Sequence, residues 1–529
     1  MKRNLSRAWA LWVRGLMVAP LSVSLFALFT EYAYAQIVKY AKTYGGTNSE
    51  RLYSVQQTSD GGYIVAGRTR SFGAGNYDIF LIKTNASGNV QWAKTYGGAD
   101  WDEAFSVRQT SDGGYIVAGR TWSFAAGVTF LIKTDASGNV QWAKTYGGTP
   151  HSVQQTSDGG YIVAGYSVSG GGNVLLIKTD ANGNLVWAKT YGGTNIDWAN
   201  SVQQTSDGGY IVAGSTRSFG AGNDDIFLIK TDANGNVQWA KTYGEWYNDR
   251  AYSVQQTPDG GYIVAGWTGS FGAGLADVFL MKTDANGNII WFKTYGGTGY
   301  DEAYSVRRTS DGGYIVAGYT ASFGAGGEDI FLIKTDANGN IQWAKTYGGI
   351  SGDKAYSVQQ TSDGGFIVAG YTESFGVGGE DIFLIKTDAN GNIGSCSIVR
   401  NASPTVTTPS PTVTMPSPYV SSVSPTVNSV SPTVTSPTLT VSAPCPLSDD
   451  NELGISESCK PVSGIITLYK GGIKVIGSGE FEVKVYNVSG VMVKSIKGKD
   501  KVKLELSRGV YFVEVISGDR VLREKVVIR

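Results

Sequence analysis

The feature that most constrains the fold is an internal repeat that runs through the first 400 residues. The triplet Asp-Gly-Gly recurs with spacings of 52, 46, 49, 52, 52 and 52 residues, beginning at Asp60, Asp112, Asp158, Asp207, Asp259, Asp311 and Asp363. Self-similarity at such a period is typical of solenoids and propellers, in which each repeat is one supersecondary unit.

Each unit carries four strand signals and no sustained helical period. In the sixth unit the signals are SVRRT, YIVAG, DIFLIKT and NIQWAKTY, and the turns Ser-Asp-Gly-Gly and Asp-Ala-Asn-Gly join them in pairs. Such turns indicate hairpins, because Gly and Asn adopt a positive φ at low cost. The run Ile330–Ile333 is apolar on both sides, which suits a blade enclosed between two neighbours.

The two ends of the array predict that it closes into a ring. Residues 37–46 align with a fourth strand, with Tyr40 in place of Trp, whereas the seventh unit breaks off after Asn392 without its fourth strand. Closure would pair two sheet edges that an open solenoid leaves exposed. We therefore predict an all-β fold in which residues 36–400 form a seven-bladed β-propeller, closed by pairing of Ile37–Tyr44 with the seventh unit near Phe383.

An aromatic position recurs in the fourth strand of the full repeats. It is occupied by Trp92, Trp142, Trp187, Trp239, Trp291 and Trp343. Aromatic stripes also occur in carbohydrate-binding repeats, but a position filled alike in successive blades favours packing between blades.

Residues 1–35 are predicted to be a signal peptide. Basic residues precede an apolar run from Leu16 to Phe29, and Ala33-Tyr34-Ala35 supplies the small residues that cleavage needs. A retained membrane anchor is the alternative, and no later segment is long and apolar enough to span a bilayer. The 44 basic and 44 acidic residues give a formal charge of zero, which argues against a nucleic-acid partner.

Residues 401–446 hold ten of the fourteen prolines and are otherwise rich in Ser, Thr and Val. This composition predicts an extended spacer that leaves the tail uncoupled from the propeller and open to proteolysis between Ala402 and Pro444. Of the three cysteines, Cys445 and Cys459 are close enough in sequence to form a disulfide, which would leave Cys396 without a disulfide partner. Three scattered cysteines make a poor zinc site.

Residues 447–529 read as a small antiparallel β-sandwich. The runs Val485–Gly490, Leu506–Val513 and Lys525–Ile528 resemble the C-terminal sorting domain of type IX secretion substrates, although the usual Pro-Asn-Pro near the domain start is missing. A generic surface sandwich is the alternative. The resemblance implies export by the secretion machinery and a secreted or outer-membrane-attached protein.

The repeats also resemble those of other secreted bacterial and archaeal proteins. Thr58–Gly62 is similar to the start of the sialidase-type Asp-box, but Val65 stands where that motif has Trp. In that family the box is a structural turn, so the likeness would imply fold and not catalysis.

No constellation of residues predicts catalysis. The only His, His151, falls in a shortened connection, where a solvated side chain is expected, and no phosphate-binding loop precedes a helix. Acidic residues recur before the first strand of most units (Glu50, Asp102, Asp197, Asp249, Asp301 and Asp353) and before the third (Asp78, Asp225, Asp277, Asp329 and Asp381). Both sets should lie on one face, and their recurrence favours a structural role over calcium binding, for which the pattern is weak, or over a catalytic pair.

Two functions remain open. The first is a secreted or cell-surface binding or adhesion protein that is not an enzyme, with a glycan or protein ligand on the face of the variable connections. Its expected contacts are Trp101, Asp102, Trp198, Trp246, Tyr247, Tyr300 and Asp301, next to a notch at the shortened connection. The alternative is a polysaccharide-active, glycosidase-like enzyme with paired acids on that face.

Overall fold

The computed structural model describes residues 39–168, 171–394, 396–415, 419–422, 428–429, 433–435, 440–445, 464–469, 472–487, 492–505, 509–517 and 520–528. Every helix or strand in this part of the chain is a β-strand. No helix long and apolar enough to cross a membrane occurs among these residues. The predicted signal peptide, residues 1–35, lies outside them.

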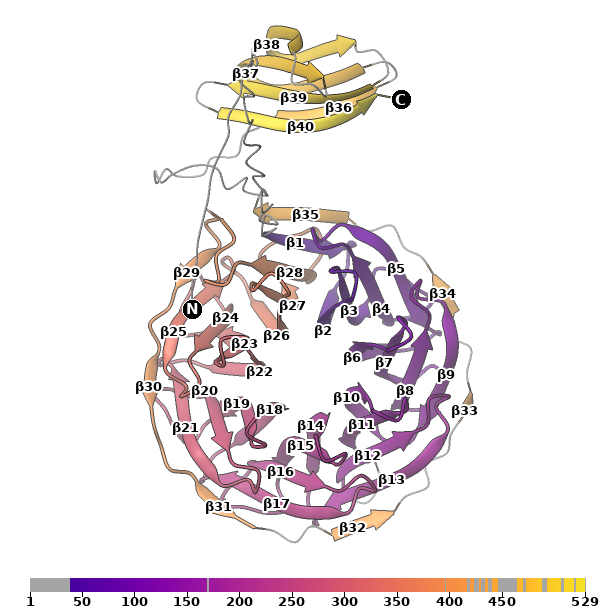
Figure 1. Cartoon of the computed structure of the whole chain (residues 1–529), viewed down its shortest axis with the longest axis vertical. Coiled ribbons are helices and arrows are strands. Elements are labelled where there is room, and N and C mark those ends of the chain that lie inside the picture. The colour runs from indigo at the N-terminus through magenta and orange to yellow at the C-terminus, as the bar shows by residue number, and fades with distance from the viewer. Residues whose placement is uncertain are drawn as a thin grey trace, which may run out of the picture. The chain divides into compact units, whose positions relative to one another are not determined.

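Seven blades are arranged around a common axis, with the first strand of each repeat innermost (Figure 1). Blade 1 consists of β2 (Glu50–Gln57), β3 (Tyr63–Thr69), β4 (Asp78–Thr84) and β5 (Val90–Gly97). Blade 2 consists of β6 (Asp102–Gln109), β7 (Tyr115–Thr121), β8 (Val128–Thr134) and β9 (Val140–Tyr146). Blade 3 consists of β10 (Thr149–Gln155), β11 (Tyr161–Tyr166), β12 (Val174–Thr179) and β13 (Leu185–Gly192).

The remaining blades repeat this order. Blade 4 consists of β14 (Asp197–Gln204), β15 (Tyr210–Thr216), β16 (Asp225–Thr231) and β17 (Val237–Gly244). Blade 5 consists of β18 (Asp249–Gln256), β19 (Tyr262–Thr268), β20 (Asp277–Thr283) and β21 (Ile289–Gly296). Blade 6 consists of β22 (Asp301–Arg308), β23 (Tyr314–Thr320), β24 (Asp329–Thr335) and β25 (Ile341–Tyr347).

Blade 7 is shared between the two ends of the array. It consists of β26 (Asp353–Gln360), β27 (Phe366–Thr372), β28 (Asp381–Thr387) and the N-terminal strand β1 (Tyr40–Gly45). Strand β1 pairs antiparallel with β28, and Thr43 lies opposite Phe383. The predicted seven-bladed ring and its closing strand are therefore confirmed.

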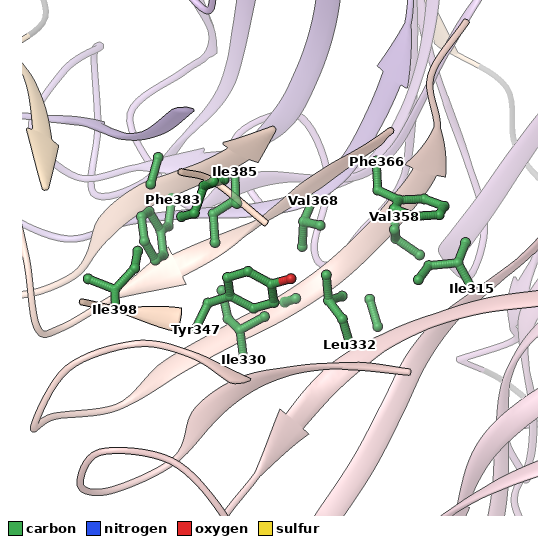
Figure 2. Close-up of a cluster of buried hydrophobic side chains, with 14 residues drawn as sticks. Ile315, Ile330, Leu332, Tyr347, Val358, Phe366, Val368, Phe383, Ile385 and Ile398 are labelled. Atoms are coloured by element: carbon green, nitrogen blue, oxygen red, sulfur yellow. The ribbon is translucent and has the colours of Figure 1, made fainter. Parts of the chain in front are cut away.

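Apolar side chains of facing blades form the core. Between blades 6 and 7, Leu332 and Tyr347 meet Phe366 and Phe383, and all four are fully buried (Figure 2). The recurrent Trp belongs to these interfaces: the ring of Trp92 lies 5.9 Å from that of Tyr115 in the next blade. The expectation that this Trp packs between blades is confirmed.

The Pro-rich segment is not a free spacer, so that prediction is wrong for the described residues. Seven short strands, here called the belt, add a fifth, outermost strand to every blade (Figure 1). In chain order they are β29 (Val399–Asn401) on blade 6, β30 (Thr405–Thr407) on blade 5, β31 (Thr412–Thr414) on blade 4, β32 (Tyr419–Ser422) on blade 3, β33 (Asn428–Ser429) on blade 2, β34 (Thr433–Thr435) on blade 1 and β35 (Thr440–Cys445) on blade 7.

The Pro-rich segment forms strands here because the outer edges of the blades need partners. Each fourth strand would otherwise present unpaired backbone groups to water, and Thr-Val-Thr triplets have high β propensity. Thr407, for example, lies opposite Thr294 of β21. Proline is tolerated between such triplets because an outermost strand does not need every N–H for pairing.

The predicted cysteine pairing is also wrong. Cys396 is disulfide-bonded, so its partner must be Cys445 or Cys459, and these two cannot pair with each other. Sequence proximity misled here because Cys396 and β35 are far apart in the chain but lie in one blade: Cys396 packs against the cluster that contains Ala41, and Ala41 lies opposite Cys445.

The tail forms one hydrogen-bonded antiparallel sheet in its described residues. Its strands are β36 (Gly464–Tyr469), β37 (Gly472–Asn487), β38 (Met492–Glu505), β39 (Gly509–Ser517) and β40 (Arg520–Ile528). The long strand β37 pairs with β36, β38 and β39. A two-sheet sandwich stays a prediction.

Candidate functional site

The two ends of the ring differ in the connections that they carry. The turn face holds the hairpin turns between first and second and between third and fourth strands. The loop face holds the connections from second to third strands and from each fourth strand to the next blade. Both sets of recurrent acidic residues start strands at the loop face, as expected.

These acidic residues are buried and serve the loops. Asp102 accepts hydrogen bonds from the Gly98 N–H at 2.9 Å and from the Ser123 hydroxyl at 2.6 Å. Asp78 accepts hydrogen bonds from two backbone N–H groups of its own loop. Both carboxyls are fully buried, so they hold the connections in shape and do not face solvent.

Burial also alters the ionisation of these groups. It raises the pKa of Asp78 to about 6, and the nearby negative charge of Asp102 contributes in the same direction. One carboxylate oxygen of Asp78 has no hydrogen-bond partner within the described part of the chain, which disfavours the charged form further. Burial raises the pKa of Asp225 and Asp277 to about 6 in the same way.

The predicted ligand contacts divide into exposed and buried groups. Trp246, Tyr247, Tyr300 and Trp101 are on the loop face and are 78%, 67%, 49% and 41% exposed. Trp198 lies in strand β14, half-buried, with the guanidinium groups of Arg217 and Arg250 over its ring at 5.6 and 5.3 Å. Asp102 and Asp301 are fully buried, so the expectation that they contact a surface ligand is wrong.

The exposed rings differ in how they are supported. Trp101 packs edge-on against Tyr77, with ring centroids 4.8 Å apart, and approaches Trp122 at 6.5 Å. Trp246 has no such ring contact among the described residues and is the most exposed aromatic side chain there. Packing against neighbouring rings therefore partly explains why an aromatic side chain stands at position 101, but it does not explain the one at position 246.

Sequence reasoning missed further apolar side chains on the same face. They are Trp122, Val168, Ile196, Leu275, Ile350 and Val377, all exposed. On the turn-face side, Val186 and Ile290 are also exposed, at the repeat position that Gln91 occupies in blade 1, so most but not all of the exposed large apolar side chains of the described blades lie on the loop face. A comparison of the loop positions between repeats could have found the loop-face residues, because each departs from the small or polar residues that other repeats have there.

Ion pairs between neighbouring blades lie beneath the loops. Glu103 accepts hydrogen bonds from Arg68 at 2.9 Å and from Arg120 at 2.5 Å, which ties blade 1 to blade 2. Asp224, fully buried, joins Arg217 of blade 4 to Arg250 of blade 5. These pairs make the base of the loop face rigid.

His151 lies in a strand, so the expectation of a solvated loop residue is wrong. It is the bulged residue of β10, and its Nδ1 lies 2.9 Å from the carbonyl oxygen of Ala199. Equivalent bulged positions hold aromatic rings that contact each other around the axis, such as Tyr53 and Phe105 at 5.6 Å. Burial lowers the pKa of His151 and so favours the neutral ring.

The turn face is built from repeated ion pairs. Lys83 donates to Asp60 at 2.8 Å, to the Thr84 carbonyl at 2.9 Å and to the Gln91 side chain at 2.9 Å. Partial burial of Asp60 opposes its ionisation, but hydrogen bonds from Lys83, Thr58 and the Gly62 N–H outweigh that effect and lower the pKa of Asp60 to about 2. The ion pair between lysine and aspartate recurs in every blade, and the glutamine contact recurs in blades 2, 4 and 6.

Metal-ligating side chains do not gather anywhere in the described residues in a group of three or more that could hold an ion. The calcium hypothesis therefore depends on pairs such as Asp78 and Asp102, and it stays a prediction.

Comparison with known proteins identifies the tail. Residues 460–529 match the family described as secretion system C-terminal sorting domain. The protein is accordingly a secreted or cell-surface protein that engages the secretion machinery through this domain.

Two further likenesses each cover part of the chain. The regulatory protein FlaEY of Caulobacter vibrioides is 30% identical over 141 residues, which is 22% of this chain and 15% of that protein. A crystal structure of a protein of unknown function from Dyadobacter fermentans is 14% identical with a TM-score of 0.36, covering 66% of this chain and 99% of the other.

Proposed function

We propose that this exported propeller is a binding or adhesion protein that recognises an extracellular glycan or protein through its loop face. The observation that carries the proposal is that most of the exposed large apolar and aromatic side chains of the described propeller blades gather on that face. Soluble proteins rarely expose contiguous apolar surface unless it contacts a partner. Aromatic rings on a rigid scaffold suit stacking on sugars or insertion into a protein partner.

The strongest part of the surface is the sector between blades 4 and 6. Trp246 and Tyr247 stand on the connection into blade 5, and Tyr300 on the connection into blade 6. Leu275, also exposed, donates its backbone N–H to the Gly299 carbonyl and so lies beside Tyr300. These four side chains form the proposed contact surface.

A binding role fits the acids better than the glycosidase-like alternative. General acid and base catalysis requires carboxyls that reach the substrate. The recurrent acids of the loop face are buried under their own loops, and the charged residues below them are used in ion pairs. We therefore propose a protein that binds without catalysis.

A glycan array and a cell-binding assay with the full exported chain test the proposal. The double variant Trp246→Ala, Tyr247→Ala should raise the dissociation constant at least about tenfold, because central aromatic contacts typically contribute about 2 kcal/mol or more. Ile290→Ala is a matched control, since Ile290 is 56% exposed but lies on the outer strand β21. Equal loss of binding in the control, or unchanged binding in the double variant, would exclude the loop face as the site.

A further inference from the structure

A second candidate site lies on the axis of the ring, away from the loop face. The first strands of all seven blades line a cavity of about 160 Å³, and each contributes one long polar residue from the same position of the repeat. The residue is Gln in five blades, namely Gln56, Gln154, Gln203, Gln255 and Gln359. It is Arg in the other two, Arg108 of blade 2 and Arg307 of blade 6.

The orientation of the five carboxamides is fixed by the backbone of the next blade. The Oε1 atom of Gln56 accepts a hydrogen bond from the Gln109 N–H at 2.7 Å. The equivalent bonds run from Gln204 to Gln154, from Gln256 to Gln203, from Arg308 to Gln255 and from Gln57 to Gln359, at 2.6 to 2.8 Å. Because a backbone N–H can donate only to the oxygen, the other half of each amide, the Nε2 donor, is left for the cavity.

The two arginines add charge to this ring of donors. Arg108 donates through Nη1 to the Val107 carbonyl at 2.8 Å and to the Ser54 hydroxyl at 3.3 Å. Arg307 makes the same two contacts, with Val306 and Ser253. Neither guanidinium has a carboxylate partner in the described part of the chain, and each keeps further N–H donors that these bonds do not use.

The two arginine side chains also lie opposite each other in the ring. Blades 2 and 6 are three steps apart through blades 1 and 7, so the two arginines face one another across the axis. Burial and the charge of Arg307 lower the pKa of Arg108. Two half-buried cations that meet only neutral acceptors are unfavourable unless a counter-charge accompanies them.

We propose that this cavity binds a small tetrahedral oxyanion of the sulfate or phosphate type, held by the guanidinium groups of Arg108 and Arg307 and by the inward Nε2 donors of the glutamine ring. The long polar side chains offer donors to the anion, beside the valine and serine side chains that also line the cavity. Charge-assisted bonds from guanidinium to an oxyanion are among the strongest hydrogen bonds in proteins.

The anion would enter from the turn face. A funnel of about 620 Å³ shares Gln203, Gln255, Arg307 and Gln359 with the cavity. It is also lined by Arg308, Gln360 and the turn around Pro258. The bulged aromatic residues lie on the other side of the ring, toward the loop face. This site is therefore independent of the proposed ligand surface.

Isothermal titration calorimetry of the purified full chain with sodium sulfate and with sodium phosphate, in a chloride buffer, tests the proposal. We expect saturable binding of at least one oxyanion and a rise in the melting temperature with its concentration. The double variant Arg108→Gln, Arg307→Gln restores the residue that the other five blades carry, so it should fold. It should raise the dissociation constant at least about tenfold, because it removes both charged donors.

Arg308→Gln is the matched control. It removes one positive charge from the funnel, where Arg308 is exposed, and leaves the ring intact. It should change the affinity by less than about threefold, as expected for an exposed charge. Absence of saturable binding of either anion to the unmodified chain, or equal affinity in the double glutamine variant, would overturn the proposal.

Discussion

The two faces of the propeller use the same side chain, aspartate, in opposite environments. On the turn face Asp60 is half-exposed and bonded to Lys83, and its pKa is lowered to about 2. On the loop face Asp78 is buried beside another carboxyl, and its pKa is raised to about 6. Among the described residues, the first face has Val186 and Ile290 as its large exposed apolar side chains, whereas most of the others in the blades lie on the second.

This difference indicates that the turn face serves stability and that the loop face serves recognition. A repeated turn with a repeated ion pair makes the blades similar and stable on the turn face. The loop face keeps its carboxyls inside to shape the connections and leaves variable rings outside. Variation in loops on a constant scaffold is how recognition surfaces commonly arise.

Removal of the Lys83 ammonium group on the turn face should have the largest effect on stability. In Lys83→Ala the buried Thr84 carbonyl and Asp60 lose a shared donor, and we expect a loss of about 3 kcal/mol in the free energy of unfolding. Chemical denaturation of the full chain measures this. Lys94→Ala, whose ammonium group bonds to Asn139 at an exposed position, should cost less than about 1 kcal/mol. Similar costs for both variants would contradict a structural role specific to the turn face.

The loop-face carboxyls should make stability fall as the pH rises from 5 to 7.5. Asp78, Asp225 and Asp277 have pKa values of about 6 in the folded chain, above the ordinary value of 3.8, so the folded state binds protons more tightly than the unfolded state. Their contribution to stability is complete below the ordinary value and is lost as the pH rises through 6. About 1 kcal/mol of it is lost between pH 5 and 7.5 for each carboxyl. Asp60 of the turn face, whose pKa is lowered to about 2, stays ionised throughout this window.

Melting curves across that pH range, compared with the triple variant Asp78→Asn, Asp225→Asn, Asp277→Asn, isolate this contribution. The variant should show a flatter dependence on pH. His151, whose pKa is lowered by burial, acts in the opposite direction and is present in both proteins. Parallel curves for the two proteins would show that these carboxyls are ionised throughout.

The smallest expected effects on stability distinguish two aromatic side chains of the loop face, Trp101 and Trp246. Trp101→Ala removes contacts with Tyr77 and Trp122 and should destabilise the chain by about 1 kcal/mol. Trp246→Ala should change stability by less than about 0.5 kcal/mol, because the ring is mostly exposed. Denaturation midpoints measure both. A larger cost for Trp246 would mean that it packs on a neighbouring loop.

Much of the fold could be predicted from the sequence because its signals are local and repeated. Asp-Gly-Gly turns mark each hairpin, and the unmatched strand at residues 37–46 predicts closure. The belt could not be recognised in this way, because its strands exist only against the blade edges and its prolines indicate loops. Thr405–Thr407 has little to identify it as a strand without β21 beside it.

The candidate sites were predictable in part. The positions of Trp246 and Asp102 on the loop face follow from strand direction, but burial of Asp102 depends on how its loop folds over it. The bulge that turns His151 toward the axis has no local signature. Arg108 and Arg307 do depart from the Gln of other repeats, a signal visible in the sequence, but only ring geometry shows that they face each other.

The position of β1 has a consequence for the order of assembly. This strand precedes all the blades in the chain, yet in its sheet it lies between β28 and β35, which follow more than 300 residues later. Every incomplete chain is thus an open arc with two unprotected edges, and the ring can form only when nearly all of the propeller sequence is available. We therefore expect premature termination before residue 387 to yield species that proteases remove, and not smaller working rings.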